Sequence, residues 1–395
     1  ASIYNIGYMR SLNEHAQTRY YTCFAIAILG AQGVSYSGGL FSLYLFYEII
    51  TLFTYPLVAH HQDEEGYAGG KKYLVYLMGT SKGFLLPALI LAYVMTGTLD
   101  FADNIRTGVF PSSADPLWIT VTYVLFVAGF AKAAIMPFHN WLPSAMVAPT
   151  PVSALLHAVA VVKAGVFCIV RVMLSTFGTG VLQDLGIGLV TAYVVSFTIL
   201  AASIIALTKD DLKARLAYST VSQLSYIILG VALLDNSGVL GGIIHIVNHG
   251  FSKITLFFCA GAIYVAHHKK KISDMAGIGY AMPFTMGAFA LASLSMIGAP
   301  PVAGFVTKWY LLNGALEIQN IPILIVLVAS TILNAGYFVP ITIRAFFEGK
   351  KERWSRKDIH EAPLTMVVPL VLASIISLVL GIFPDFFVGL IGKLF

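Results

Sequence analysis

The sequence predicts an all-α polytopic membrane protein with about 11 transmembrane helices, and three observations support this fold class. First, 58% of the 395 residues are hydrophobic and 11% are charged, whereas a soluble domain carries about 25% charged residues. Second, the chain divides into apolar stretches of about the 20 residues that a helix needs to cross a bilayer. Third, the basic residues lie in the loops between these stretches, and when the loops are assigned alternately to the two sides of the membrane, nearly all of them fall on one side.

The predicted spans follow one another with short connections. They cover residues 20–37, 39–59, 73–94, 117–136, 152–174, 186–207, 212–234, 239–266, 283–312, 321–347 and 364–389. Pro137 ends the fourth span, and Pro300, Pro301 and Gly304 interrupt the ninth. Broken helices in two halves of a chain are typical of transporters built from inverted repeats.

We therefore expect a first inverted repeat over residues 20–174 and a second over residues 186–347. Residues 1–19 resemble the cytoplasmic end of a preceding helix, and residues 348–395 form a basic cytoplasmic loop and the last span. Lysine and arginine residues mark one side of the membrane as the cytoplasm, which places the N-terminus there. They are Arg10, Arg19, Lys71, Lys72, Lys209, Lys213, Arg215, Lys269, Lys270, Lys271, Arg344, Lys350, Lys351, Arg353, Arg356 and Lys357, against Arg106, Arg171 and Lys393 on the other side.

Several function classes find no support. Membrane topology explains the net charge of +5, so we expect no nucleic-acid partner. No phosphate-binding GxxxxGK[ST] loop or GxGxxG fingerprint occurs, and the three cysteines lack metal-ligand spacing. We expect no cofactor and no metal. The loop cluster His60, His61, Asp63, Glu64 and Glu65 fits solvated charges better than a metal site, as does the pair His267 and His268 beside lysines.

Six charged side chains lie inside the apolar spans and carry the functional signal. They are Glu48, Lys82, Lys132, Lys163, Lys253 and Lys308. A charge at the bilayer centre costs about 2.5–3.5 kcal/mol on insertion scales, so these residues indicate a polar track enclosed by protein.

Glu48 is the carboxylate of this set, and its expected partner is a lysine on a neighbouring span. Lys132 is the best candidate, because the helix break at Pro137 would admit water to its ammonium group. A static buried ion pair that only fixes helix packing is the alternative. Lys82 either acts on Glu48 from the adjacent span or extends toward the cytoplasm.

Histidines accompany the lysines of the later spans. His157 and Lys163 lie about 9 Å apart along one helix and about 120° apart around it, so one or two waters could link them as a proton relay. For His157 a structural role is the alternative. His245, His249 and Lys253 recur every four residues on one stripe of a helix, which favours a proton wire over a metal site because lysine is a poor ligand.

Three segments carry a family resemblance: AKAAIMPFHNWLPSAMVAPTPVSALLHAVAVVKAG, DDLKARLAYSTVSQLSY and HIVNHGFSKITLFF. They resemble the antiporter-like membrane subunits shared by respiratory complex I, Mrp-type sodium/proton antiporters and membrane-bound hydrogenases. The segments IGYMRSLNEHAQTRYYTCFAIAI and LFYEIITLFTYPLVAH are most similar to the D-type Mrp subunit. The resemblance implies a 14-helix fold with two inverted five-helix repeats, of which three helices would be absent from this sequence.

The resemblance also implies roles for the buried residues. Glu48 and Lys132 fall on the family's glutamate and first broken-helix lysine, and Lys308 falls on the terminal charge of the second broken helix. The central titratable groups would be His157, Lys163, His245, His249 and Lys253. At Lys82 some relatives carry an aspartate, so its role stays open.

The leading functional hypothesis is a proton-translocating subunit of an Mrp-like cation/proton antiporter. It would lie in a bacterial or archaeal cell membrane, within a complex of other membrane subunits, and move protons with or without Na⁺. This chain would have no redox site of its own. The alternatives are a pump subunit of a redox complex, such as a complex I relative or a hydrogenase, and an ion-coupled partner of inorganic-carbon uptake. A purely structural scaffold gives no reason to keep six buried charges.

Overall fold

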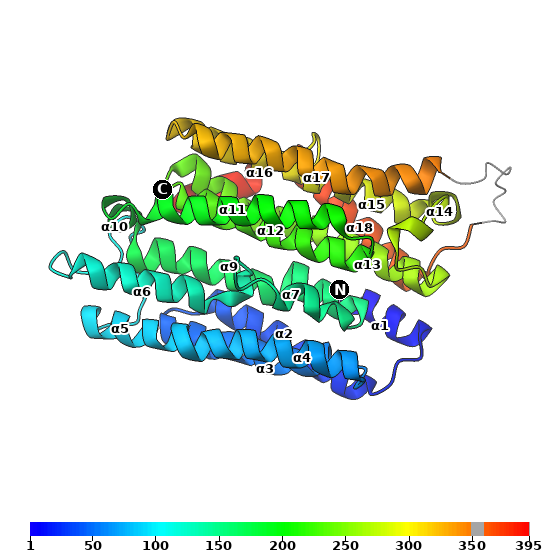
Figure 1. Ribbon diagram of the computed structural model, residues 1–395, viewed down its shortest axis with the longest axis horizontal. Helices are drawn as coiled ribbons and strands as arrows, with labels where there is room; N and C mark the ends of the chain where they lie inside the picture. The colour runs from blue at the N-terminus through cyan, green and yellow to red at the C-terminus, as the bar shows by residue number, and fades with distance from the viewer. Residues whose placement is uncertain (349–358, 395) are drawn as a thin grey trace.

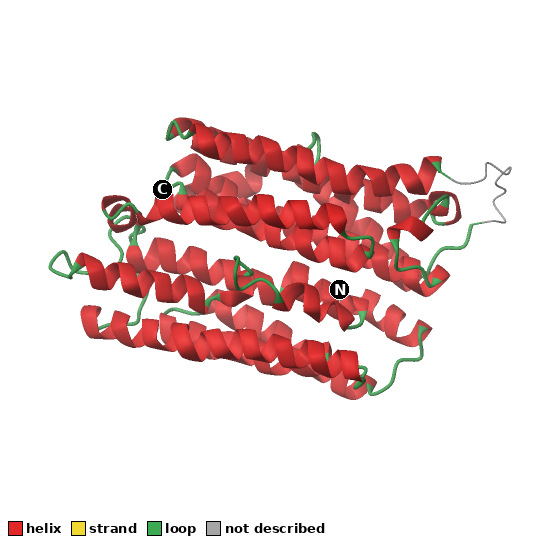
Figure 2. Cartoon of the chain, in the orientation of Figure 1, coloured by secondary structure: helices red, strands yellow, loops and turns green. Residues whose placement is uncertain are grey.

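The computed structural model describes residues 1–348 and 359–394 as a bundle of helices whose axes run in nearly one direction (Figure 1). Figure 2 shows the connecting loops gathered mainly at the two ends of the bundle. Strand pairing among the described residues is limited to two isolated bridges, Gly39 with Asp100 and Asp211 with Lys271. This architecture confirms the predicted all-α membrane class.

Most helices among the described residues are joined by short turns, and residues 97–115 form a longer connection. The first half contains α1 (Ser2–Ser11), α2 (Gln17–Tyr36), α3 (Leu40–Val58), α4 (Glu64–Thr80), α5 (Leu86–Thr96), α6 (Pro116–Gly129), α7 (Trp141–Ser144), α8 (Thr150–Ala154), α9 (Val161–Val172) and α10 (Thr179–Asp184). The second half contains α11 (Ile187–Thr208), α12 (Leu212–Ala232), α13 (Asn236–His267), α14 (Ile278–Ala281), α15 (Pro283–Ile297), α16 (Ala303–Glu317), α17 (Ile321–Phe347), α18 (Leu364–Ile382) and α19 (Asp385–Ile391).

Local sequence sets several helix starts. Asp63, Asp115, Asp211 and Asp235 precede α4, α6, α12 and α13, and each carboxylate accepts a backbone N–H from the first turn. Such a cap satisfies a donor that the helix itself cannot satisfy. These four boundaries therefore follow from the sequence alone.

Within the described residues, seven helices are long and apolar enough to cross a membrane, by length and composition. They are Leu40–Val58, Glu64–Thr96, Thr150–Phe177, Ile187–Thr208, Asn236–His267, Ile321–Phe347 and Leu364–Ile382. Two further helices, α2 and α12, have 20 and 21 residues and more polar sequences. These seven helices, α2 and α12, and the two broken helices α6–α7 and α15–α16 correspond one to one to the 11 predicted spans.

Both predicted helix breaks are present. After α6 the chain leaves the regular helix at Phe130 and becomes α-helical again at Trp141, with only a short 3₁₀ turn at Ala131–Ala133 between. The second break separates α15 from α16, where Gly298 has a φ of 86°, a backbone conformation that favours glycine. Such breaks leave backbone carbonyls free to bind side chains or ions inside the protein.

Two π-helical turns hold candidate residues, and the sequence patterns did not predict them. Ser81–Leu85 joins α4 to α5 and contains Lys82. Leu155–Val159 follows α8 and contains His157. A π turn widens a helix locally and occurs frequently at functional sites.

The two halves pack side by side in Figure 1, with α2 to α9 below α11 to α17. Helix α13 contacts α8 and α9 of the first half, and also α12, α15, α16 and α18 of the second. The predicted repeats, 20–174 and 186–347, occupy these two groups of helices, and their inverted relationship stays a prediction.

The loops 12–16, 59–63 and 268–277 lie at one end of the bundle, and the 97–115 connection lies at the other (Figure 1). This agrees with the alternation on which the predicted sidedness rests. The basic residues Lys350, Lys351, Arg353, Arg356 and Lys357 of the predicted 348–395 segment lie outside the described residues.

Candidate functional site

Glu48 pairs with Lys82, which corrects the expected pairing with Lys132. Glu48 lies on α3 and is 8% exposed. Its Oε2 is 3.3 Å from Lys82 Nζ, and its Oε1 accepts a hydrogen bond from the Ser81 hydroxyl. Lys82 Nζ also donates to the Tyr44 hydroxyl at 2.9 Å. The π turn places Ser81 and Lys82 together against α3, and a regular helical pattern gave no sign of this arrangement.

Lys132 is fully buried at the first helix break and is bound by Tyr47. Its Nζ donates to the Tyr47 carbonyl at 2.6 Å and lies 3.1 Å from the centre of the Tyr47 ring. The ring hydroxyl accepts the backbone N–H of Lys132 at 3.3 Å. Tyr47 directly precedes Glu48, so the carbonyl that accepts from Lys132 belongs to the peptide unit that joins Tyr47 to Glu48. The two charges are therefore neighbours without forming an ion pair.

Lys163 connects the two halves of the molecule. Its Nζ lies 2.8 Å from His249 Nδ1, so a hydrogen bond joins α9 to α13. The His157 ring contacts the Phe257 ring at 4.7 Å, and neither of its nitrogens has a hydrogen-bond partner among the described residues. The direct partner of Lys163 is thus His249, and the expected water link between Lys163 and His157 stays a prediction.

His245 continues the line from His249, and the centres of the two rings are 5.6 Å apart. His245 Nε2 is 3.0 Å from Gln223 Oε1, and its Nδ1 is 3.1 Å from Thr307 Oγ1. Both ring nitrogens are therefore occupied by neutral partners from α12 and α16. Because the Gln223 amide oxygen can only accept, Nε2 carries a proton and donates to it, and Nδ1 of the neutral ring accepts from the Thr307 hydroxyl.

Lys253 and Lys308 are both held by neutral oxygen atoms. Lys253 Nζ donates to the Ser219 hydroxyl at 2.9 Å. Lys308 Nζ donates to the Ile297 carbonyl at 2.6 Å and to the Thr331 hydroxyl at 2.7 Å. Ile297 is the last residue of α15, so the second helix break supplies this acceptor.

A polar network on α12 and α17 joins these lysines, and our sequence reasoning missed it. The Tyr337 hydroxyl donates to Asn334 Oδ1 at 2.5 Å and lies 3.2 Å from the Ser219 hydroxyl, which can donate to it. Asn334 and Gln223 then donate to the Met296 carbonyl at 3.3 and 3.2 Å, next to the carbonyl that binds Lys308. The sequence did contain a signal for this network, because Ser219, Gln223 and Tyr226 recur at helical spacing within one apolar span. The structure shows all three buried.

The electrostatics of this track are unusual for a protein interior. Lys132, Lys163, Lys253 and Lys308 are each at most 8% exposed, and among the described residues no carboxylate lies within 4 Å of their ammonium groups. Their acceptors are carbonyls, hydroxyls and one imidazole. A lysine held by neutral acceptors can exchange its proton without breaking an ion pair, as a relay requires.

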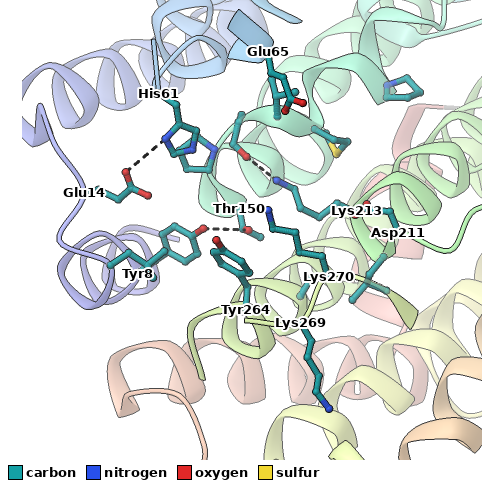
Figure 3. Close-up of a pocket in the computed structure, with 18 of the residues that line it drawn as sticks. Tyr8, Glu14, His61, Glu65, Thr150, Asp211, Lys213, Tyr264, Lys269 and Lys270 are labelled. Atoms are coloured by element: carbon teal, nitrogen blue, oxygen red, sulfur yellow. Dashed lines mark hydrogen bonds and ion pairs between the residues drawn. The ribbon is translucent and has the colours of Figure 1, made fainter. Parts of the chain in front are cut away.

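A cavity of about 580 Å³ lies at the end of the bundle where the basic loops gather (Figure 3). Its wall includes Tyr8, Thr150 and Tyr264, and Lys213 Nζ donates to the Ala148 carbonyl at 2.6 Å. Ala148 and Thr150 lie between the first helix break and His157. The cavity thus lies next to the segment that leads from the first helix break to His157.

Comparisons with known proteins agree with this geometry. Residues 37–334 match the family described as NADH:quinone oxidoreductase/Mrp antiporter, TM. The chain is 34% identical to NADH-quinone oxidoreductase subunit N of Desulforudis audaxviator, covering 98% of this chain and 78% of that protein. It is 29% identical to Na⁺/H⁺ antiporter subunit A1 of Staphylococcus epidermidis, covering 97% of this chain and half of that longer protein.

Solved structures show the same fold. A chain of the Mrp complex from Dietzia sp. superposes with a TM-score of 0.83 at 24% identity, covering 93% of this chain and 76% of that chain. A chain of the membrane-bound sulfane sulfur reductase, an archaeal respiratory membrane complex, gives a TM-score of 0.83 at 25% identity, covering 95% of this chain and 75% of that chain. The family match and the long apolar helices among the described residues make this a multi-pass membrane protein. The chain belongs to the NADH:quinone oxidoreductase/Mrp antiporter transmembrane family.

Proposed function

We propose that the chain moves protons through the membrane as one subunit of an Mrp-like cation/proton antiporter. The observation that carries the proposal is the ordered series of buried lysines with neutral acceptors. It runs through Lys132, Lys163, Lys253 and Lys308, and the Lys163–His249 hydrogen bond crosses between the halves. A static scaffold has no need of lysines that are buried without counter-charges.

The ion pair at Glu48 supplies the control step. With Lys82 close, the carboxylate is neutralised, and Lys132 keeps only the Tyr47 carbonyl as its acceptor. When Lys82 moves away, the negative charge of Glu48 acts on Lys132 across one peptide unit and favours its protonated form. Motion of Lys82 thereby changes whether Lys132 holds or releases a proton.

The released proton would pass to Lys163 and then along the histidines of α13. His249 and His245 would carry it along α13, and Lys253, hydrogen-bonded to Ser219, and Lys308 would receive it through water. His157 would join this path through water, because its buried nitrogens need hydrogen-bond partners.

Lys82 also indicates where a partner subunit binds. Its side chain is 51% exposed on a helix that crosses the membrane, and an ammonium group facing hydrocarbon is unfavourable. We infer that a neighbouring membrane subunit covers the α3 and α5 surface there. Movement of that subunit would then displace Lys82 from Glu48.

A second candidate function is a pump subunit of a redox-driven complex. The 34% identity with NADH-quinone oxidoreductase subunit N favours it, and the proton path would be the same. The third candidate, a partner of inorganic-carbon uptake, has no specific observation in its favour. In each case we place the protein in a bacterial or archaeal cell membrane with its N-terminus in the cytoplasm, because of the basic loops.

Inside-out membrane vesicles that contain the assembled complex test the proposal. An imposed acid interior should dissipate when Na⁺ is added, and Glu48→Ala should abolish this response while the exposed Glu64→Gln leaves it intact. Proton pumping driven by a reductant and insensitive to Na⁺ would favour the redox complex instead. Full activity of Glu48→Ala in either assay would contradict the proposed mechanism.

A further inference from the structure

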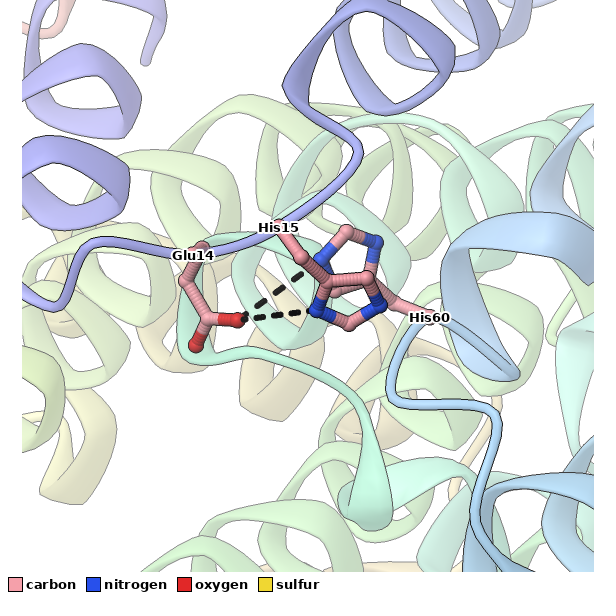
Figure 4. Close-up of side chains that lie close together, drawn as sticks. All are labelled: Glu14, His15 and His60. Carbon is pink, nitrogen blue, oxygen red and sulfur yellow. Dashed lines mark ion pairs between the residues drawn. The ribbon is translucent and has the colours of Figure 1, made fainter.

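Four acidic and histidine side chains meet at the end of the bundle, away from the proton track. Glu14 and His15 lie in the loop between α1 and α2, and His60 and His61 follow α3. Figure 4 shows the Glu14, His15 and His60 side chains turned toward one another. One ligand atom from each of these three residues lies within 4.8 Å of the others.

The spacing of these atoms is close to that of a metal site. Glu14 Oε2 is 3.7 Å from His60 Nε2 and 4.0 Å from His15 Nδ1. Bonds of about 2.0–2.2 Å to a tetrahedral Zn²⁺ place ligand atoms about 3.4 Å apart. The two distances from Glu14 are thus about 0.3 and 0.6 Å longer than in such a site, and the His15 and His60 ligand atoms lie within 4.8 Å of each other.

His60 provides an independent indication of a ligand. Its side chain is fully buried, and neither ring nitrogen has a hydrogen-bond partner among the described residues. The expectation of a solvated loop cluster is wrong for His60, because the rings of His15 and Tyr20 cover it at 4.7 and 5.1 Å. A buried imidazole without hydrogen bonds is unfavourable; Glu14 lies 3.7 Å from Nε2, beyond hydrogen-bond distance, and a metal bound between them would satisfy this nitrogen.

The surroundings hold His60 in place. Arg19 Nη2 donates to the His60 carbonyl at 3.2 Å and so fixes the backbone of the turn. His61 Nδ1 is 3.8 Å from the same Glu14 oxygen, close enough to complete a fourth position. Glu14 and His61 also line the cavity of Figure 3, through which a hydrated ion could arrive.

We propose that Glu14, His15 and His60 form a binding site for a divalent transition metal of the Zn²⁺ class, with water or His61 as the fourth ligand. Two or three imidazoles and one carboxylate suit Zn²⁺, whereas Mg²⁺ and Ca²⁺ prefer oxygen ligands. A bound ion would join the α1–α2 loop to the turn after α3, the helix that carries Glu48.

The test is a titration of the detergent-purified protein, together with the subunits that copurify with it, using Zn²⁺ and then Co²⁺ as a spectroscopic probe. We expect one ion per chain and a tetrahedral Co²⁺ spectrum. His15→Ala and His60→Gln should each weaken Zn²⁺ binding at least about tenfold. Removing a residue that hydrogen-bonds to a metal ligand already costs this much, and removing the ligand itself should cost at least as much. Glu14→Gln should weaken it as well.

His268→Asn is the matched control, because His268 is exposed at the same end of the bundle and asparagine tolerates its φ of 55°. It should bind Zn²⁺ as the unaltered protein does. His15 is half exposed, so His15→Ala keeps the test decisive if His60→Gln fails to fold. Absence of stoichiometric Zn²⁺ binding, or unchanged affinity in His15→Ala, would overturn the proposal.

Discussion

The two helix breaks each hold a buried lysine, but their electrostatic settings differ. At the first break, Lys132 lies beside the peptide that leads to Glu48, and the carboxylate pairs with the half-exposed Lys82. At the second break, Lys308 is bound only by the Ile297 carbonyl and the Thr331 hydroxyl. The first region therefore contains a charge pair that an outside event can alter, whereas the second contains a lysine whose hydrogen-bond partners are all neutral.

This difference indicates that the two regions have different roles in proton transport. A charge pair close to the surface can receive a signal from a partner subunit, because moving one charge changes the field on the other. Neutral partners generate no such field, but the imidazoles and hydroxyls among them can accept and donate protons, while the amides hold the neighbouring groups in place. The predictions below change one region while leaving the other intact.

The largest effect should come from Lys132→Ala, which removes the lysine that the charge pair controls. We expect proton transport by the reconstituted complex to fall by about 100-fold or more, the range for losing a proton-transfer group. Lys71→Ala, at an exposed position of α4, should retain full transport. Transport close to normal in Lys132→Ala would show that the first break is not part of the path.

A smaller effect should follow from Lys82→Ala, which leaves the path intact but unpairs Glu48. We expect transport to fall by about tenfold, within the range of a typical coupling between two sites. Lys82→Arg should restore most of the rate, because it keeps the positive charge beside Glu48 and Tyr44. Equal rates for the alanine and arginine variants would mean that the charge of Lys82 has no controlling role.

The smallest effect should come from Tyr337→Phe in the second region. The variant loses the hydroxyl that bonds Ser219 and Asn334 but keeps the ring. We expect transport to fall by about threefold, since one neutral hydrogen bond contributes about 0.5–1.5 kcal/mol. Proton flux measured with a pH-sensitive dye inside proteoliposomes would detect this change. A loss as large as that of Lys132→Ala would contradict the assignment of Tyr337 to one branch of a network.

The sequence predicted the spans and both breaks because hydrophobic length and proline positions act locally. It also identified all the buried lysines and histidines of the track, since an ionisable residue in an apolar span stands out by itself. The sequence could not predict which side chains pair. The Glu48–Lys82 ion pair depends on a π turn, and the Lys163–His249 hydrogen bond depends on how α9 packs against α13. The burial of His60 likewise depends on a loop 45 residues earlier in the chain covering it.

The central claim is that protons cross between the halves through Lys163 and His249, and a double-mutant cycle on proton flux tests it most directly. Lys163→Ala and His249→Ala should each reduce flux by about 100-fold in complexes that assemble normally. The double variant should be no slower than either single variant, because both residues act in one step. Normal flux in either single variant, or losses that multiply in the double variant, would contradict the account.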